Sequence, residues 1–123
     1  MILIIGNILA LLISVALGAI GVRFLLNPRV AAEGYGVPAG SDGGSAYLSA
    51  KGARDISVAL LGVVLVCFGG AHATGLFMLV MALIPLADAV IVTRNGGRRS
   101  IVLGVHFSTA VLVLIDSVLL LLS

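Results

Sequence analysis

Some of the ionisable side chains in this largely apolar sequence are of the types that acid–base chemistry needs. Lys51, Arg54 and Asp55 stand at relative positions i, i+3 and i+4, a spacing that puts them on the same side of a helix. Asp88 and His106 follow in two later apolar segments. A carboxylate can take a proton from a bound molecule, and a second acid or a histidine can return one. The set therefore predicts proton-transfer chemistry, either isomerisation or the opening of an epoxide.

Two aspartates held apart by an arginine can divide the roles of general acid and general base, and Asp55, Arg54 and Asp88 supply that set. His106 or Tyr35 could orient water or substrate. We predict a catalytic group of Asp55, Asp88, Arg54 and His106, and a substrate-binding group of Tyr35, Lys51 and Glu33. The alternative is structural: Arg54 would neutralise one aspartate and His106 would hydrogen-bond a carbonyl, which would pin the helices together.

Composition shows what kind of protein must position these groups. Of 123 residues, 61% are hydrophobic and 10% are charged, and the mean hydropathy is +1.30. Charged residues make up about a quarter of a typical soluble domain, so the chain is predicted to be an integral membrane protein. The single cysteine, Cys67, cannot form a disulfide within the chain and gives no information on the redox compartment.

Four apolar segments are candidates for spanning helices, each compared with the ~20 residues that cross a bilayer core. They lie at about 2–26, 46–69, 73–93 and 100–123. The second needs its polar start, because its purely apolar part, 56–70, is too short to cross unaided. This predicts an all-α fold, an integral membrane four-helix bundle in one transmembrane domain, 1–123. The long glycine-rich connector 27–45 predicts a lid over the polar groups or, alternatively, a tether.

The basic residues indicate the orientation of this bundle, since lysine and arginine mark the cytoplasmic side of membrane proteins. All seven fall in or beside the first and third connectors, and the second connector carries only His72. We therefore predict a multi-pass protein of the cell membrane, with both termini outside and connectors 27–45 and 94–99 in the cytoplasm. The predicted catalytic residues then converge in the cytoplasmic half of the bundle, where buried charges indicate a functional site.

Several short motifs can be compared with known families. They are KGARD at 51–55, Pro85 followed by Asp88, His106 early in the fourth helix, NPR at 27–29 and YGVP at 35–38. Together they resemble a family of small four-helix membrane proteins of bacteria and fungi, of largely unassigned function. Some fungal members lie beside polyketide pathways, so the resemblance implies chemistry on lipophilic small molecules, including epoxide opening by hydrolysis or cyclisation. In residue kinds, the Asp–Arg–Asp set is also similar to that of the soluble limonene-epoxide-hydrolase type.

The residue types and their spacing also bear on metal, cofactor and nucleic acid binding. One cysteine and two histidines on opposite sides predict no metal site, and there is no glycine-rich phosphate loop of Walker type. We expect no cofactor, and the sequence does not suggest a nucleic acid partner. The predicted partners are a lipophilic small-molecule substrate and the lipid bilayer. Two rivals remain, a small proton-coupled transporter and a structural or partner-binding membrane subunit. For the second, Ser14, Gly18 and Gly21 form a small-residue stripe that would serve an internal helix contact or a homo-oligomer equally well.

Overall fold

The computed structural model describes residues 1–40 and 45–123, and this part of the chain is helical, with no strand. The all-α prediction is therefore confirmed for the described residues. Residues 41–44, which belong to the predicted lid, lie outside them. The elements are α1 (Ile2–Leu26), α2 (Pro28–Tyr35), α3 (Ser45–Val64), the π-helical η1 (Leu65–Gly69), α4 (Gly70–Met81), α5 (Leu83–Arg94), α6 (Arg99–Ile101), the π-helical η2 (Val102–Phe107) and α7 (Ser108–Leu122).

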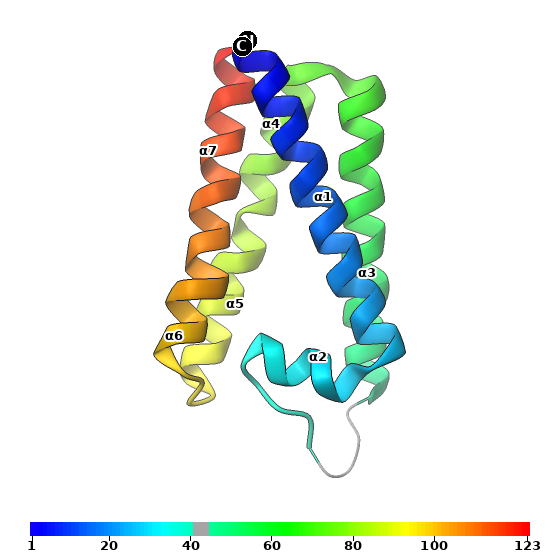
Figure 1. Cartoon of the computed structure of the whole chain (residues 1–123), viewed down its shortest axis with the longest axis vertical. Helices are drawn as coiled ribbons and strands as arrows, with labels where there is room; N and C mark the ends of the chain where they lie inside the picture. Colours follow the sequence, from blue (N-terminus) through cyan, green and yellow to red (C-terminus); the bar gives the residue numbers. More distant parts are fainter. Residues whose placement is uncertain (41–44) are drawn as a thin grey trace.

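Long helical rods run side by side, formed by α1, by α3 with η1, by α4 with α5, and by α6 with η2 and α7 (Figure 1). Both termini lie at one end of the bundle, and the short α2 crosses the other end (Figure 1). Three continuous helical stretches are long and apolar enough to cross a membrane: Ile2–Leu26, Ala46–Arg94 and Arg99–Leu122. The middle stretch has 49 residues, about twice the length of one crossing, and contains two rods.

The middle stretch reverses direction at two consecutive glycines. Gly70 has φ +81°, a left-handed backbone angle that glycine adopts without the penalty a side chain brings. Figure 1 shows the chain turning here at the end that carries the termini. The sequence predicts a short connector between the segments 46–69 and 73–93. The structure places α4 directly after η1, so the third rod begins at Gly70 and not at residue 73.

Small residues let α1 and α3 approach closely. A Cβ atom on Gly21 would lie 2.7 Å from the carbonyl oxygen of Gly52, and one on Gly18 would lie 3.3 Å from the Cβ of Ala59. Backbones can meet in this way only where side chains are absent or minimal. The small-residue stripe of α1 therefore serves an internal helix contact, which was one of its two predicted uses.

The segment after α1 is a helix where the sequence predicts part of a loop. Pro28 stands at its first turn, where a missing N–H costs nothing, and Gly36 ends it with φ 109°. Its buried side chains are Ala31 and Ala32, which face the bundle. Residues 28–35 of the predicted connector 27–45 therefore form α2, which crosses one end of the bundle (Figure 1).

Candidate functional site

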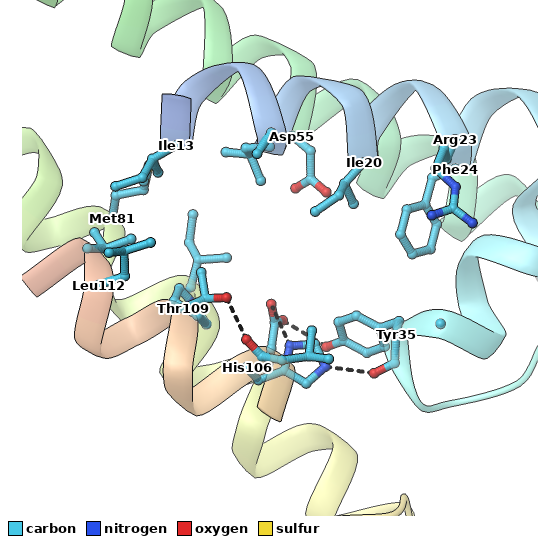
Figure 2. Close-up of a pocket in the computed structure, with 18 of the residues that line it drawn as sticks. Ile13, Ile20, Arg23, Phe24, Tyr35, Asp55, Met81, His106, Thr109 and Leu112 are labelled. Carbon is cyan, nitrogen blue, oxygen red and sulfur yellow. Dashed lines mark hydrogen bonds and ion pairs between the residues drawn. The ribbon is translucent and has the colours of Figure 1, made fainter. Parts of the chain in front are cut away.

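A cavity of about 530 Å³ lies between the rods, beside α2. This volume is in the range of pockets that bind small molecules. Most of its lining is apolar and comes from α1, α4, α5 and α7. Its polar side chains come from α1, α2, α3, α5, η2 and α7, and they are Arg23, Tyr35, Lys51, Asp55, Asp88, His106 and Thr109 (Figure 2).

Asp88 is held by two side chains from other elements. The hydroxyl of Tyr35 donates a hydrogen bond to Oδ1 of Asp88 at 2.7 Å. Oδ2 of Asp88 faces Nδ1 of His106 at 3.9 Å, which is within ion-pair distance when the imidazole is protonated. Side-chain exposure is 18% for Asp88 and 7% for His106, so both groups are largely shielded from solvent.

His106 is fixed in one tautomer by the backbone of α2. Its Nε2 lies 2.6 Å from the carbonyl oxygen of Tyr35, and because a carbonyl can only accept, Nε2 must carry the hydrogen and donate it. In the neutral ring, Nδ1 then has a lone pair, and it is this nitrogen that faces Asp88. His106 can therefore take up a proton on the side of the carboxylate without losing its contact with α2.

Lys51 and Asp55 form a second pair across the cavity. Nζ of Lys51 lies 2.7 Å from Oδ2 of Asp55, one helical turn away on α3. The same ammonium lies 4.5 Å from the ring centroid of Phe24 and 5.2 Å from that of Tyr35, which is the geometry of cation–π contacts. Tyr35 therefore contacts both pairs, with its ring near the ammonium of Lys51 and its hydroxyl bonded to Asp88.

Tyr35 stays a neutral phenol at physiological pH. Burial raises the pKa of its hydroxyl well above the usual value, and the hydrogen bond to Asp88 and the negative charges of Asp88 and Asp55 raise it further. The deprotonated form would add a third negative charge to the same cavity, which explains the direction of these effects. Tyr35 is thus a lasting hydrogen-bond donor to Asp88.

The predicted site residues divide into two groups in the structure. Asp55, Asp88 and His106 of the catalytic group line the cavity, as do Tyr35 and Lys51 of the substrate-binding group. Arg54 and Glu33 are exposed and do not line it.

The helical rotation explains why Arg54 and Glu33 point away. Successive residues on an α-helix are about 100° apart, so with Asp55 in the cavity Arg54 points outward, while Lys51, one turn earlier, stays beside Asp55. On α2, Tyr35 shares a face with the buried Ala31, which leaves Glu33 on the opposite face. The predicted Asp–Arg–Asp arrangement is therefore corrected: the cation beside Asp55 is Lys51.

The cavity is also lined by residues outside the predicted site, among them Arg23, Phe24 and Thr109. The structure places Arg23, near the end of α1, at the exposed edge of the cavity, near α2 (Figure 2). Phe24 is 2% exposed and packs under Lys51 and Tyr35. The spacing of Arg23 with Leu12, Ala16 and Ile20, at i, i+4, i+8 and i+11, could have signalled one shared helix face.

Irregular helix geometry occurs beside two of the candidate catalytic residues, Asp88 and His106. Pro85 has no N–H to continue the hydrogen-bond ladder, and the rod is interrupted at Ala82, between α4 and α5, three residues before it. Asp88 follows one turn after Pro85. His106 lies within the π-helical η2, and such wide turns are frequent at functional sites. Among the residues that the structure describes, no three His, Cys, Asp or Glu side chains are grouped to hold a metal ion.

Asp116 is a buried polar residue at a distance from this site. It is 0% exposed and does not line the cavity. Neither of its carboxylate oxygens, nor the hydroxyl of Ser14, has a hydrogen-bond partner within the described residues. Its neighbour Ser117 donates to the carbonyl oxygen of Gly75 and so connects α7 to α4.

Comparison with known proteins gives one match. The model of a family described as "Domain of unknown function (DUF4267)" matches residues 14–120. No curated protein and no solved structure matches the chain. The matched range contains all the polar residues of the cavity.

Proposed function

The chain belongs to this uncharacterised family, DUF4267, and from its cavity we propose that it is a membrane-embedded acid–base enzyme that isomerises a lipophilic small molecule. The observation that carries the proposal is the contact of one carboxylate, Asp88, with both Tyr35 and His106 at the wall of a largely apolar cavity. Ionisable groups that are shielded from solvent, contact one another and face a small-molecule pocket are typical of catalytic sites. The bacterial and fungal distribution of the family and its link to polyketide pathways stay predictions.

A bilayer location is supported by the outer surface. Large apolar side chains are more than half exposed on the rods, for example Leu60 at 61%, Val80 at 65% and Leu83 at 63%. An apolar surface of this extent is suited to lipid and not to water. The basic residues lie in segments at the α2 end, which we propose to be cytoplasmic, with both termini outside; they are Arg23, Arg29, Lys51, Arg54, Arg94, Arg98 and Arg99.

In the proposed reaction, Asp88 is the base. Its Oδ2 removes a proton from a substrate carbon next to a carbonyl group, and the electron pair of that C–H bond moves toward the carbonyl oxygen. The ammonium of Lys51, on the other side of Tyr35, stabilises the negative charge that develops on this oxygen. The carboxyl group of Asp88, whose proton exchanges with those of water before the second step, then donates a proton to a different carbon. The substrate thereby changes its double-bond position, and nothing is consumed.

Tyr35 and His106 have supporting roles in this mechanism. The hydroxyl of Tyr35 holds Oδ1 of Asp88, which leaves Oδ2 to face the substrate and His106. Nδ1 of His106 can hold the proton between the two steps, because its Nε2 is already committed to α2.

Isomerisation fits these residues better than epoxide hydrolysis. With Arg54 outside the cavity, the Asp–Arg–Asp set that suggested epoxide opening is not assembled. Hydrolysis would also need a positioned water in a cavity whose lining is mostly apolar. Internal proton transfer needs no second reactant.

Deuterium incorporation tests the proposal without knowledge of the natural substrate. The protein, in lipid nanodiscs in D₂O, is incubated with a panel of lipophilic ketones, including β,γ-unsaturated ones, and deuterium uptake is followed by mass spectrometry. We expect uptake above that of empty nanodiscs, and a loss of about 100-fold or more in Asp88→Asn, since a general base contributes at least that much. Glu33→Gln is the matched control, because this carboxylate is exposed outside the cavity. An Asp88→Asn protein that is folded and exchanges like wild type would remove Asp88 from the mechanism.

A further inference from the structure

Two rows of side chains both line the cavity and are exposed, which makes them the rim of its opening. On α1, Leu12 is 62% and Ile20 is 45% exposed. On the facing rod, Val105 of η2 is 45% and Leu112 of α7 is 43% exposed. The opening therefore lies between α1 and the η2–α7 rod. These rods meet near the termini, where Gly6 packs against Leu120, and separate toward α2 (Figure 1).

The position of this opening decides from which side a ligand enters. It is on the flank of the bundle, along helices that are long enough to cross a bilayer, and its rim is apolar over most of its length. In the proposed membrane orientation, such an opening faces acyl chains and not water. A molecule dissolved in the bilayer can enter it without leaving lipid.

The charges in the cavity are balanced except at one edge. Lys51 is paired with Asp55, and Asp88 accepts from Tyr35. Arg23 stands at the α2 end of the rim, and no carboxylate of the described residues lies within ion-pair distance of it. A guanidinium offers a fork of donors that matches the two oxygens of a carboxylate or a phosphate. This edge is suited to an anionic group.

The apolar lining residues of α1 indicate the length and character of the ligand. From Arg23 to Leu9, the first lining residue of α1, the helix rises over 14 residues, roughly 21 Å, along side chains that are all apolar apart from Arg23 itself. We propose that the cavity takes a single-chain anionic amphiphile sideways from the bilayer, with its acidic group on Arg23 and its chain along α1. This inference rests on the proposed function and adds the substrate class.

Competition with a fluorescent fatty acid tests the inference by binding alone, independent of catalysis. The protein in nanodiscs is loaded with cis-parinarate, and myristate, myristyl alcohol or myristylammonium is added as competitor. We expect displacement by myristate at concentrations about tenfold or more below those needed for the alcohol, with the ammonium the weakest, since a charge-assisted hydrogen bond is worth about one decade of affinity. Equal displacement by all three would overturn the role of the anionic group.

Matched variants assign the effect to Arg23 and to the opening. We expect Arg23→Gln to weaken parinarate binding about tenfold and Arg23→Lys to restore part of it, whereas Arg29→Gln, an exposed cation of α2 outside the cavity, should bind like wild type. Ile20→Trp at the rim should slow uptake of the probe, and Val15→Trp, 63% exposed on α1 but not lining the cavity, should not. Loss of binding in Arg29→Gln equal to that in Arg23→Gln would reduce Arg23 to an interfacial cation. Asp88→Asn should keep binding, so failure of the mechanism and failure of this inference are distinguishable.

Discussion

Replacement of Tyr35 by phenylalanine isolates a single hydroxyl group. The variant keeps the ring, and therefore the contacts with Phe24, with His106 at 4.8 Å between centroids, and with the ammonium of Lys51. It removes the 2.7 Å hydrogen bond to Oδ1 of Asp88. Since the side chain of Asp88 is only 18% exposed, the carboxylate oxygen would be left with little solvent to replace the lost donor.

The size of the effect follows from the charge on the acceptor. A hydrogen bond to a charged group contributes about 1.5–3 kcal/mol, and the lower half of this range applies because Tyr35 is only partly buried. At about 1.4 kcal/mol per decade, the rate of deuterium exchange should fall roughly 12- to 40-fold. Loss of the same bond should lower the unfolding temperature by several degrees, because it connects α2 to α5.

The other tyrosine supplies the control for this experiment. Tyr47 is 84% exposed at the start of α3, so Tyr47→Phe should match wild type in both exchange rate and thermal unfolding. Both measurements are made in the same nanodiscs, by mass spectrometry and by a thermal scan with a thiol-independent dye. A Tyr35→Phe protein that is indistinguishable from Tyr47→Phe in both would refute the assignment of Tyr35 as the residue that positions Asp88.

Further predictions concern pH, the buried core, helix packing and topology. Because the pKa of Tyr35 is raised in the folded protein, its contribution to stability is present below about pH 10, where the unfolded side chain is neutral, and is lost as pH rises toward the folded pKa. The difference in unfolding temperature between wild type and Tyr35→Phe should therefore narrow above about pH 10. Asp116→Asn should retain exchange activity and folding, because this residue lies outside the cavity; proton-coupled flux in vesicles that depends on Asp116 would favour the transporter instead. Gly21→Ala should cost about 1–3 kcal/mol of stability through collision with α3, whereas Gly104→Ala, with open space at its Cβ, should be tolerated. In a Cys67→Ser background, impermeant thiol reagents added outside cells should label His72→Cys and not Asn95→Cys, and the reverse pattern would invert the proposed orientation.

Hydropathy predicts the rods well because burial in lipid or protein demands runs of apolar residues, whatever the details of packing. Hydropathy does not show which face of a helix points into the bundle when every face is apolar. For this reason the sequence predicts that Arg54 belongs to the site. The rotation of α3 about its axis is set by the packing of Gly52 against Gly21, which turns Lys51 and Asp55 toward the cavity. A period of 3.6 residues gives relative positions on a helix but no absolute rotation.

Residues 28–35 were missed for a different reason. The segment is short and not very apolar, so it gives no spanning signal, and the glycine-rich connector 27–45 in which it lies favours a loop interpretation. The terminal signals were nevertheless present, with Pro28 at the start and Gly36 at the end. The contact of His106 with the Tyr35 carbonyl, 71 positions apart in sequence, depends on the tertiary fold, and no local pattern predicts it.

The π-helical η2 also bears on how such a site could arise. A π-helical turn contains one residue more than the α-helical turn it replaces, so removal of a single codon between Val102 and Gly104 would restore a regular helix. His106 would then turn by about 100° relative to the residues before it and leave Asp88 and the Tyr35 carbonyl. The hydrophobic content of the rod would hardly change, so the apolar helix would be retained. Gain and loss of the proposed catalytic arrangement would thus be separated by one small insertion or deletion, and a descendant without it would keep the helical rods and a cavity in which His106 no longer faces Asp88.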